Sequence, residues 1–144
     1  MSNLKNGVLK IAGVEIDSNT LLKDAEIKFS NANIEVRRRT NGRATLRFLQ
    51  PIKLGSRNFR VSVAFKNEHI WGIELMVDDP SISNPIISEE DFWRYVAKQR
   101  EWLIEELGES DGIRDDIVYS WGKIVPWFDF RSFGAGISII YFQK

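Results

Sequence analysis

The chain has 144 residues, of which 43% are hydrophobic and 28% are charged, and none is cysteine. This composition excludes an intrinsically disordered chain, and the length suits one domain with one core, expected over residues 1–144. The lack of cysteine excludes disulfides, thiolate metal sites and cysteine nucleophiles.

The sequence carries no evident targeting or membrane segment. Residues 1–10 lack the apolar run of a secretory signal, and no apolar stretch approaches the ~20 residues of a membrane-spanning helix. Together with the lack of cysteine, this predicts a cytoplasmic protein that does not act at a membrane.

The charges are unevenly distributed, although the formal net charge is zero. Residues 1–70 carry 13 Lys/Arg against 6 Asp/Glu, and residues 71–144 carry 7 against 14, so the halves have net charges of +7 and −7. A fold that keeps the halves apart would be dipolar and would steer a charged partner onto one side. A fold that interleaves them would cancel most of this field.

The N-terminal half, up to residue 77, consists of short segments of alternating apolar residues that end at Gly, Asn, Asp or Pro, as is typical of strands. We expect the first strand over residues 8–16. A short helix is expected near residue 20, with Ser18 or Asn19 as its cap.

Two further strands are expected on either side of a turn at Asn67-Glu68. Residues 59–65 alternate as a half-buried strand, and residues 70–77 return beside it. In the returning strand, alternation places Trp71 on the apolar face with Ile73. These segments predict a meander of antiparallel strands.

The hairpin around Asn41 and Gly42 has two possible registers. A two-residue turn would place Ile34 on the same face as Arg43, which mixes apolar and charged residues on both faces. A three-residue loop over residues 40–42, with Gly42 at positive φ, separates them, and we predict this loop. The charged face then holds Glu35, Arg37, Arg39, Arg43, Thr45 and Arg47.

The longest helix is predicted over residues 89–107. Ser88 is a favourable N-cap with Asp91 three residues later, and Gly108 stands where a left-handed C-terminal residue belongs. At about 100° per residue, the helix has an apolar stripe that must cover one face of a sheet. The stripe consists of Phe92, Val96, Leu103 and Leu107, with Trp93 and Ile104 at its edge.

The remaining residues complete the predicted fold. Residues 78–87 are typical of a connector, and two final strands are expected over residues 117–127 and 136–142. Asp129 and Arg131 are expected to fix the loop between these strands by hydrogen bonds or an ion pair. The fold class predicted is α+β: a predominantly antiparallel sheet of about six or seven strands with one long helix packed on one face.

The sequence offers little that is typical of catalysis. The single histidine, His69, cannot form a metal cluster alone, and the glycine-containing residues 134–136 lack the helix and lysine of a phosphate loop. Carboxylate pairs such as Glu105 and Glu106 lie at helix ends or loop edges, where solvation is expected. We therefore expect a protein that is not an enzyme and holds no metal or cofactor.

The arginine face of the hairpin is a candidate binding surface. Its four arginines, which could contact phosphates or an acidic protein, are Arg37, Arg39, Arg43 and Arg47. The outward positions of the hairpin hold no aromatic residue that could stack on bases. A solvated face, on which Glu35 pairs across to Arg47, is the simpler interpretation.

The long helix offers a second candidate surface. A second stripe runs along the helix beside the centre of the apolar stripe and consists of Tyr95, Gln99, Trp102 and Glu106. We expect this stripe to be exposed and surrounded by acidic residues. Exposed Tyr and Trp are enriched at interface hot spots, although Trp102 could instead lie under a neighbouring loop. The predicted partner-binding residues are Tyr95, Gln99, Trp102, Glu105, Glu106, Glu109, Asp111, Asp115 and Asp116.

Several short motifs resemble those of small bacterial proteins encoded beside polymorphic toxins. They are Glu101-Trp102-Leu103, Tyr119-Ser120-Trp121-Gly122, Asp129-Phe130-Arg131-Ser132 and Ile137-Ser138-Ile139-Ile140-Tyr141. On these motifs the chain is similar to immunity proteins, including those of contact-dependent growth inhibition systems. The resemblance implies that the chain binds a cognate toxin domain and blocks it, but it identifies no binding residues.

Two hypotheses follow. In the first, the acidic helix and its following loop cover the basic substrate channel of a nuclease toxin, and the protein neutralises the toxin by occlusion. Its partner is then a basic toxin domain, and neither a membrane nor nucleic acid. In the second, the chain is a small nucleic-acid-binding or regulatory module that uses Arg37, Arg39, Arg43 and Arg47.

Overall fold

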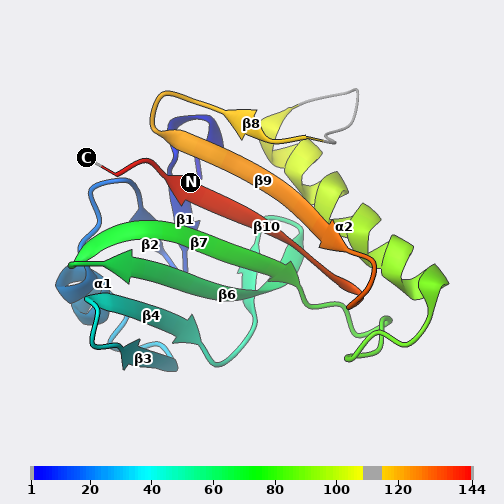
Figure 1. Cartoon of the computed structure of the whole chain (residues 1–144), viewed down its shortest axis with the longest axis horizontal. Helices are drawn as coiled ribbons and strands as arrows, with labels where there is room; N and C mark the ends of the chain where they lie inside the picture. Colours follow the sequence, from blue (N-terminus) through cyan, green and yellow to red (C-terminus); the bar gives the residue numbers. More distant parts are fainter. Residues whose placement is uncertain (1, 109–114, 144) are drawn as a thin grey trace.

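The computed structural model describes residues 2–108 and 115–143. Its architecture is α+β, with an eight-stranded antiparallel sheet, a separate two-stranded hairpin and one long helix packed against the large sheet (Figure 1). The predicted fold class is therefore confirmed. The strand count is higher than expected because short strands of two or three residues are too brief to show a clear alternation.

The elements follow one another as short strands interrupted by two helices. In chain order they are η1 (Leu4–Asn6), β1 (Leu9–Ile11), β2 (Val14–Ile16), α1 (Leu22–Lys28), β3 (Ile34–Arg38), β4 (Arg43–Phe48), β5 (Ile52–Leu54), β6 (Arg57–Lys66), β7 (His69–Val77), α2 (Glu89–Leu107), β8 (Ile117–Val118), β9 (Gly122–Asp129) and β10 (Gly134–Tyr141). The large sheet has the order β3-β4-β6-β7-β10-β9-β8, and β5 pairs with β6.

This strand order keeps the two halves of the sequence apart. Strands β3 to β6 come from the basic half and form one side of the sheet, while β8, β9 and β10 come from the acidic half and form the other. Helix α2, also from the acidic half, packs against β7, β9 and β10. Within the large sheet the basic strands therefore lie on one side and the acidic strands on the other, which favours a dipolar field, although η1 of the N-terminal half contacts α2.

One face of the large sheet forms the core. A row of register neighbours crosses it, all of them buried: Leu46, Val63, Ile73, Ile139 and Ile124. Helix α2 covers this face on one side, and the N-terminal elements β1, β2 and α1 lie behind the other (Figure 1). The opposite face of the sheet, which is turned toward the viewer in Figure 1, has no helix over it and is called the open face below.

The N-terminal prediction needs two corrections. Residues 8–16 form a hairpin of two strands, β1 and β2, and not one strand. Its turn residues Ala12 and Gly13 have φ values of 49° and 84°, as a type I′ turn requires. The short helix exists, but it begins at Leu22 and its N-cap position is Leu21.

The predicted three-residue loop over residues 40–42 is confirmed. Val36 pairs with Leu46, and the backbone N–H of Arg39 donates to the Arg43 carbonyl oxygen at 2.8 Å. Gly42 has a φ of 79°, a conformation in which a side chain would be strained. The arginine side chains therefore project from the open face as expected.

The predicted position of Trp71 is wrong. Phe65 pairs with Ile70 and Ala64 pairs with Gly72, so a β-bulge leaves Trp71 without a partner in β6. Ile70 takes the core position instead, and the Trp71 side chain is 42% exposed. A single extra residue thus moves a tryptophan from the expected apolar face to the surface.

The C-terminal half combines confirmed and corrected boundaries. Helix α2 spans the predicted residues, with the Ser88 hydroxyl accepting from the backbone N–H of Asp91 and Gly108 at a φ of 71°. The strand predicted over residues 117–127 is two strands, β8 and β9, since the chain turns between them.

Candidate binding surfaces

The predicted exposed stripe on α2 is buried. Tyr95, Gln99 and Trp102 are 5%, 2% and 1% exposed, so the expectation that they meet a partner is wrong. The buried residues of α2 span an arc of about 140° at 100° per residue, wider than the stripe read from the sequence. The additional flank packs against β5, β6 and the segment that joins them.

The contacts of these three side chains are internal. The Trp102 indole N–H donates to the Leu54 carbonyl oxygen at 2.8 Å, and its ring meets the Phe59 ring edge-on at 4.7 Å. The Arg60 guanidinium donates to the Tyr95 hydroxyl at 3.2 Å, and burial raises the pKa of that hydroxyl. The stripe therefore anchors α2 to the sheet.

The acidic residues of the prediction remain at the surface where the structure describes them. Glu105 is exposed and accepts from the Ser56 hydroxyl at 2.9 Å. Burial, and then the neighbouring Glu105 carboxylate, raise the pKa of Glu106. Asp115 and Asp116 are exposed, with Asp116 3.9 Å from the Lys123 ammonium. The predicted residues Glu109 and Asp111 lie outside the described residues.

A different aromatic group is exposed at the N-terminal end of α2. Trp93, Phe128 and Phe130, here called the aromatic corner, are 43%, 45% and 46% exposed. The Trp93 ring lies 5.4 Å from the Phe128 ring and stacks on the Phe130 ring at 5.9 Å, between ring centroids. Below them, the fully buried Phe92 contacts all three rings. The corner is one connected cluster built from two elements.

The aromatic corner is held by polar contacts around it. The Asp129 carboxylate accepts from the Arg131 backbone N–H at 3.0 Å and from the Ser132 hydroxyl at 3.1 Å, as the sequence predicted for this loop. The Arg100 guanidinium lies 5.7 Å from the centre of the Phe128 ring. Sequence reasoning missed the corner because Phe128 and Phe130 are distant from Trp93 in the chain. The loop predicted after residue 127 nevertheless contains Phe128, Phe130 and Phe133, and three aromatic residues in one loop are a signal of an aromatic surface.

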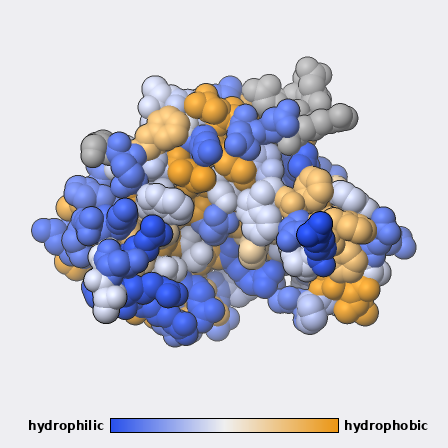
Figure 2. Space-filling model, viewed as in Figure 1, coloured by the Kyte–Doolittle hydropathy of each residue, from blue (hydrophilic) through white to orange (hydrophobic). Residues whose placement is uncertain are grey.

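The arginine face lies on β3 and β4, where hydrophilic residues gather at the lower left of Figure 2. Arg37 and Arg47 both donate to the Glu35 carboxylate, at 3.0 and 3.4 Å, so the predicted pairing across the hairpin is confirmed. Arg39 and Arg43 form no ion pair with any described residue. The face therefore keeps a positive potential.

The open face also contains a groove of about 470 Å³ beside the arginine face. Arg47, Arg60, Glu74 and Met76 line it, together with Pro51 at its rim. Desolvation raises the pKa of Glu74, against the opposing hydrogen bonds that its carboxylate accepts from the Ser138 hydroxyl and the Trp127 indole N–H. This groove joins the basic and acidic halves of the sheet.

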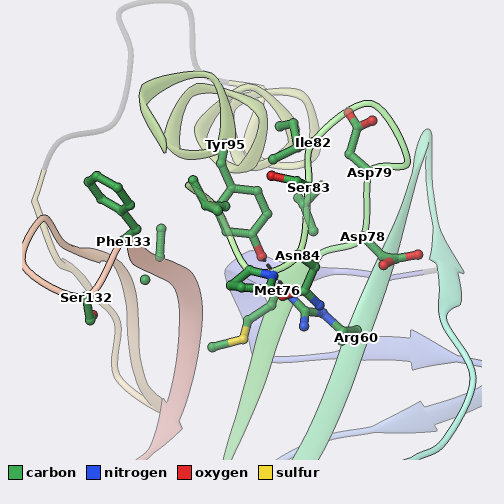
Figure 3. Close-up of a pocket in the computed structure, with 15 residues that line it drawn as sticks. Arg60, Met76, Asp78, Asp79, Ile82, Ser83, Asn84, Tyr95, Ser132 and Phe133 are labelled. Atoms are coloured by element: carbon green, nitrogen blue, oxygen red, sulfur yellow. Dashed lines mark hydrogen bonds between the residues drawn. The ribbon is translucent and has the colours of Figure 1, made fainter. Parts of the chain in front are cut away.

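A smaller cavity of about 190 Å³ lies under the connector between β7 and α2 (Figure 3). Tyr95 points into it from α2 and its hydroxyl meets Arg60, while the connector contributes Asn84. The Asp79 carboxylate accepts from the Lys98 ammonium at 2.9 Å, which ties the connector to α2. These contacts have a structural purpose, since they fix the helix that carries Trp93.

No metal site and no membrane helix occur in the part of the chain that the structure describes. Residues 2–108 and 115–143 contain no group of three or more His, Cys, Asp or Glu side chains placed to hold a metal ion. None of the helices in these residues is long and apolar enough to cross a membrane. Comparison with protein-family models, curated proteins and solved structures finds no match for this chain.

Proposed function

We propose that this chain is an immunity-type protein that binds a cognate toxin domain and blocks its active site. The class of function is the one that the sequence resemblance implies. The aromatic corner supports this proposal most strongly, because Trp and Phe rings that are exposed, clustered and rigidly held are typical of interface hot spots.

The charges around α2 favour a basic partner. Glu89 and Glu90 lie in the first turn beside Trp93, and Glu105 and Glu106 lie on the last turns. All belong to the half of the chain with a net charge of −7, whose strands β8, β9 and β10 form one side of the sheet. A nuclease toxin, whose substrate channel must be basic to bind a polyanion, has the complementary charge.

Neutralisation would occur by occlusion. The acidic flank of α2 would speed the encounter with the basic channel, and burial of the aromatic corner would slow dissociation. This division of roles replaces the sequence-based hypothesis, in which Tyr95 and Trp102 were the anchors. No chemical step by this chain is needed.

The test uses the toxin domain expected at the C-terminus of a large secreted protein encoded immediately upstream. Trp93→Ala and Phe128→Ala should each weaken binding by about 2 kcal/mol, or roughly 30-fold, because hot-spot aromatics contribute this much. Binding is measured by calorimetry, and protection by growth of cells that express the toxin.

The matched control is Trp71→Ala, which removes a tryptophan of nearly equal exposure, 42% against 43%, far from the corner. This control should bind and protect as the unmodified protein does. Equal loss from Trp71→Ala and Trp93→Ala would contradict the assignment of the surface, and absence of any toxin binding would contradict the function.

A further inference from the structure

The bulge in β7 creates an arrangement that the sequence did not reveal. It turns Trp71 onto the open face, where the ring lines a hollow of about 170 Å³ with Arg39, Arg43 and Lys66. The hairpin itself supplies no aromatic residue, but its neighbour in the sheet does. The aromatic group whose absence argued against nucleic acid is therefore present.

The cations around Trp71 have no ion-pair partner among residues 2–108 and 115–143. No described carboxylate lies within ion-pair distance of Arg39, Arg43 or Lys66. The next arginines along the sheet, Arg37 and Arg47, share the single carboxylate of Glu35. The hollow is thus the centre of a surface on which positive charges outnumber negative ones.

The spacing of these groups suits an extended polyanion. Alternate residues of one strand lie about 7 Å apart on the same face, and neighbouring strands lie about 5 Å apart. Arg37 and Arg39 are such alternate residues on β3 and its extension, and Arg43 pairs directly opposite Lys66. The result is a regular array of guanidinium and ammonium groups beside one exposed indole ring.

We propose that the surface formed by Arg37, Arg39, Arg43, Arg47, Lys66 and Trp71 binds single-stranded nucleic acid. Phosphates contact the cations, and an unpaired base stacks on the Trp71 ring. A single strand is favoured over a duplex because stacked and paired bases cannot reach the ring. It is favoured over an acidic peptide because a peptide needs the cations but not the exposed indole.

This surface is separate from the aromatic corner. The arginine strands lie at one side of the sheet and the β9–β10 turn with the start of α2 lies at the other (Figure 1). The inference therefore does not depend on the toxin-binding function, and the purified chain alone suffices to test it.

The experiment titrates the full chain into a fluorescently labelled single strand of roughly 12 nucleotides, as RNA and as DNA, and follows anisotropy. Binding should weaken between about 50 and 200 mM salt, with a log–log slope of about −2 to −3.5 for three to five phosphate contacts. Trp71→Ala should weaken binding roughly 5- to 160-fold, as expected for loss of one stacked base.

Two variants separate the contributions. Replacing Arg39 and Arg43 together by serine should weaken binding and also make the salt slope shallower, because fewer counterions are released. The control Trp93→Ala should bind the strand as the unmodified protein does. All the altered side chains are exposed, so unfolding curves should stay close to that of the unmodified protein.

Three results would overturn the inference. They are no binding of the single strand at the lower salt, binding that Trp71→Ala leaves unchanged, and binding of a polyglutamate peptide or a duplex as tight as that of the single strand. None of these results bears on toxin binding, since they concern a different surface and a different partner.

Discussion

Two tryptophans on one helix have opposite environments. Trp93 and Trp102 are nine residues apart on α2, which places them about 14 Å apart along the axis and half a turn apart around it. Trp102 is 1% exposed and donates to the Leu54 carbonyl oxygen, whereas Trp93 is 43% exposed and stacks on Phe130. The same residue type thus serves the core at one end and the surface at the other.

The contrast shows why an aromatic residue on a helix is not by itself evidence of a binding site. What distinguishes the two is the cover provided by distant segments, since the segment before β6 covers Trp102 almost completely, whereas Phe128 and Phe130 cover Trp93 only in part and leave it 43% exposed. A partner could contact only Trp93. Both ends of α2 carry acidic residues, but only the N-terminal end also carries an exposed aromatic cluster.

The largest expected effect tests the buried member of the pair. Trp102→Ala should lower the free energy of unfolding by about 3–5 kcal/mol, because it leaves a cavity against Phe59 and a carbonyl oxygen without its donor. Urea denaturation measures the change. Trp93→Ala should lower the free energy of unfolding by about 1 kcal/mol or less. Similar losses from both variants would contradict the distinction between a structural Trp102 and a surface Trp93.

A smaller effect is expected at the ion pair between Asp79 of the connector and Lys98 in the middle of α2. The Lys98 ammonium, and then Ser81, lower the pKa of Asp79 from 3.8 to about 2. Because the folded-state pKa is the lower one, the stabilisation is complete above pH 3.8 and is lost as the pH falls towards 2.

Asp79→Asn should therefore lower the unfolding free energy by about 1 kcal/mol at neutral pH, allowing for screening by water. The difference from the unmodified protein should disappear near pH 2. Denaturant midpoints at the two pH values check this. A loss that persists in acid would mean that the connector is held by geometry and not by charge.

The smallest effect is expected at the acidic end of the helix. Glu106→Lys should reduce the association rate with a basic toxin domain about two- to fivefold at low salt and have little effect at high salt, because it changes long-range attraction. Stopped-flow mixing measures this, and Trp93→Ala should instead speed dissociation. If Glu106→Lys proved to be the more damaging change, the contact would be centred on the other end of α2.

Local signals predicted the regular parts of the fold. Ser88 and Gly108 define the ends of α2 because capping is a short-range interaction, and the side-chain alternation of β3 and β4 defines the loop at Gly42. The same alternation misled at Trp71, because a bulge shifts the pattern by one residue without a sequence mark. The hairpin at Ala12 was missed because its strands are only three residues long.

The candidate binding surfaces were harder to predict than the fold. The arginine face follows from one hairpin, so the sequence identified it. The aromatic corner requires α2 to meet the β9–β10 turn, a contact between residues more than 30 positions apart that no periodicity encodes. Burial of Tyr95 and Trp102 likewise depends on β5 and β6, which lie far from α2 in the chain.

The position of β10 has a consequence for biosynthesis. Although β10 follows both β7 and β9 in the chain, it is hydrogen-bonded between them in the interior of the sheet. Ribosomes add about 5–20 residues per second, so β7 and β9 emerge first, and until β10 follows, the edges that pair with it present unpaired backbone N–H and C=O groups. Only insertion of β10 joins the two sides, so a nascent or truncated chain that lacks it can assemble neither a closed core nor the turn that carries Phe128 and Phe130.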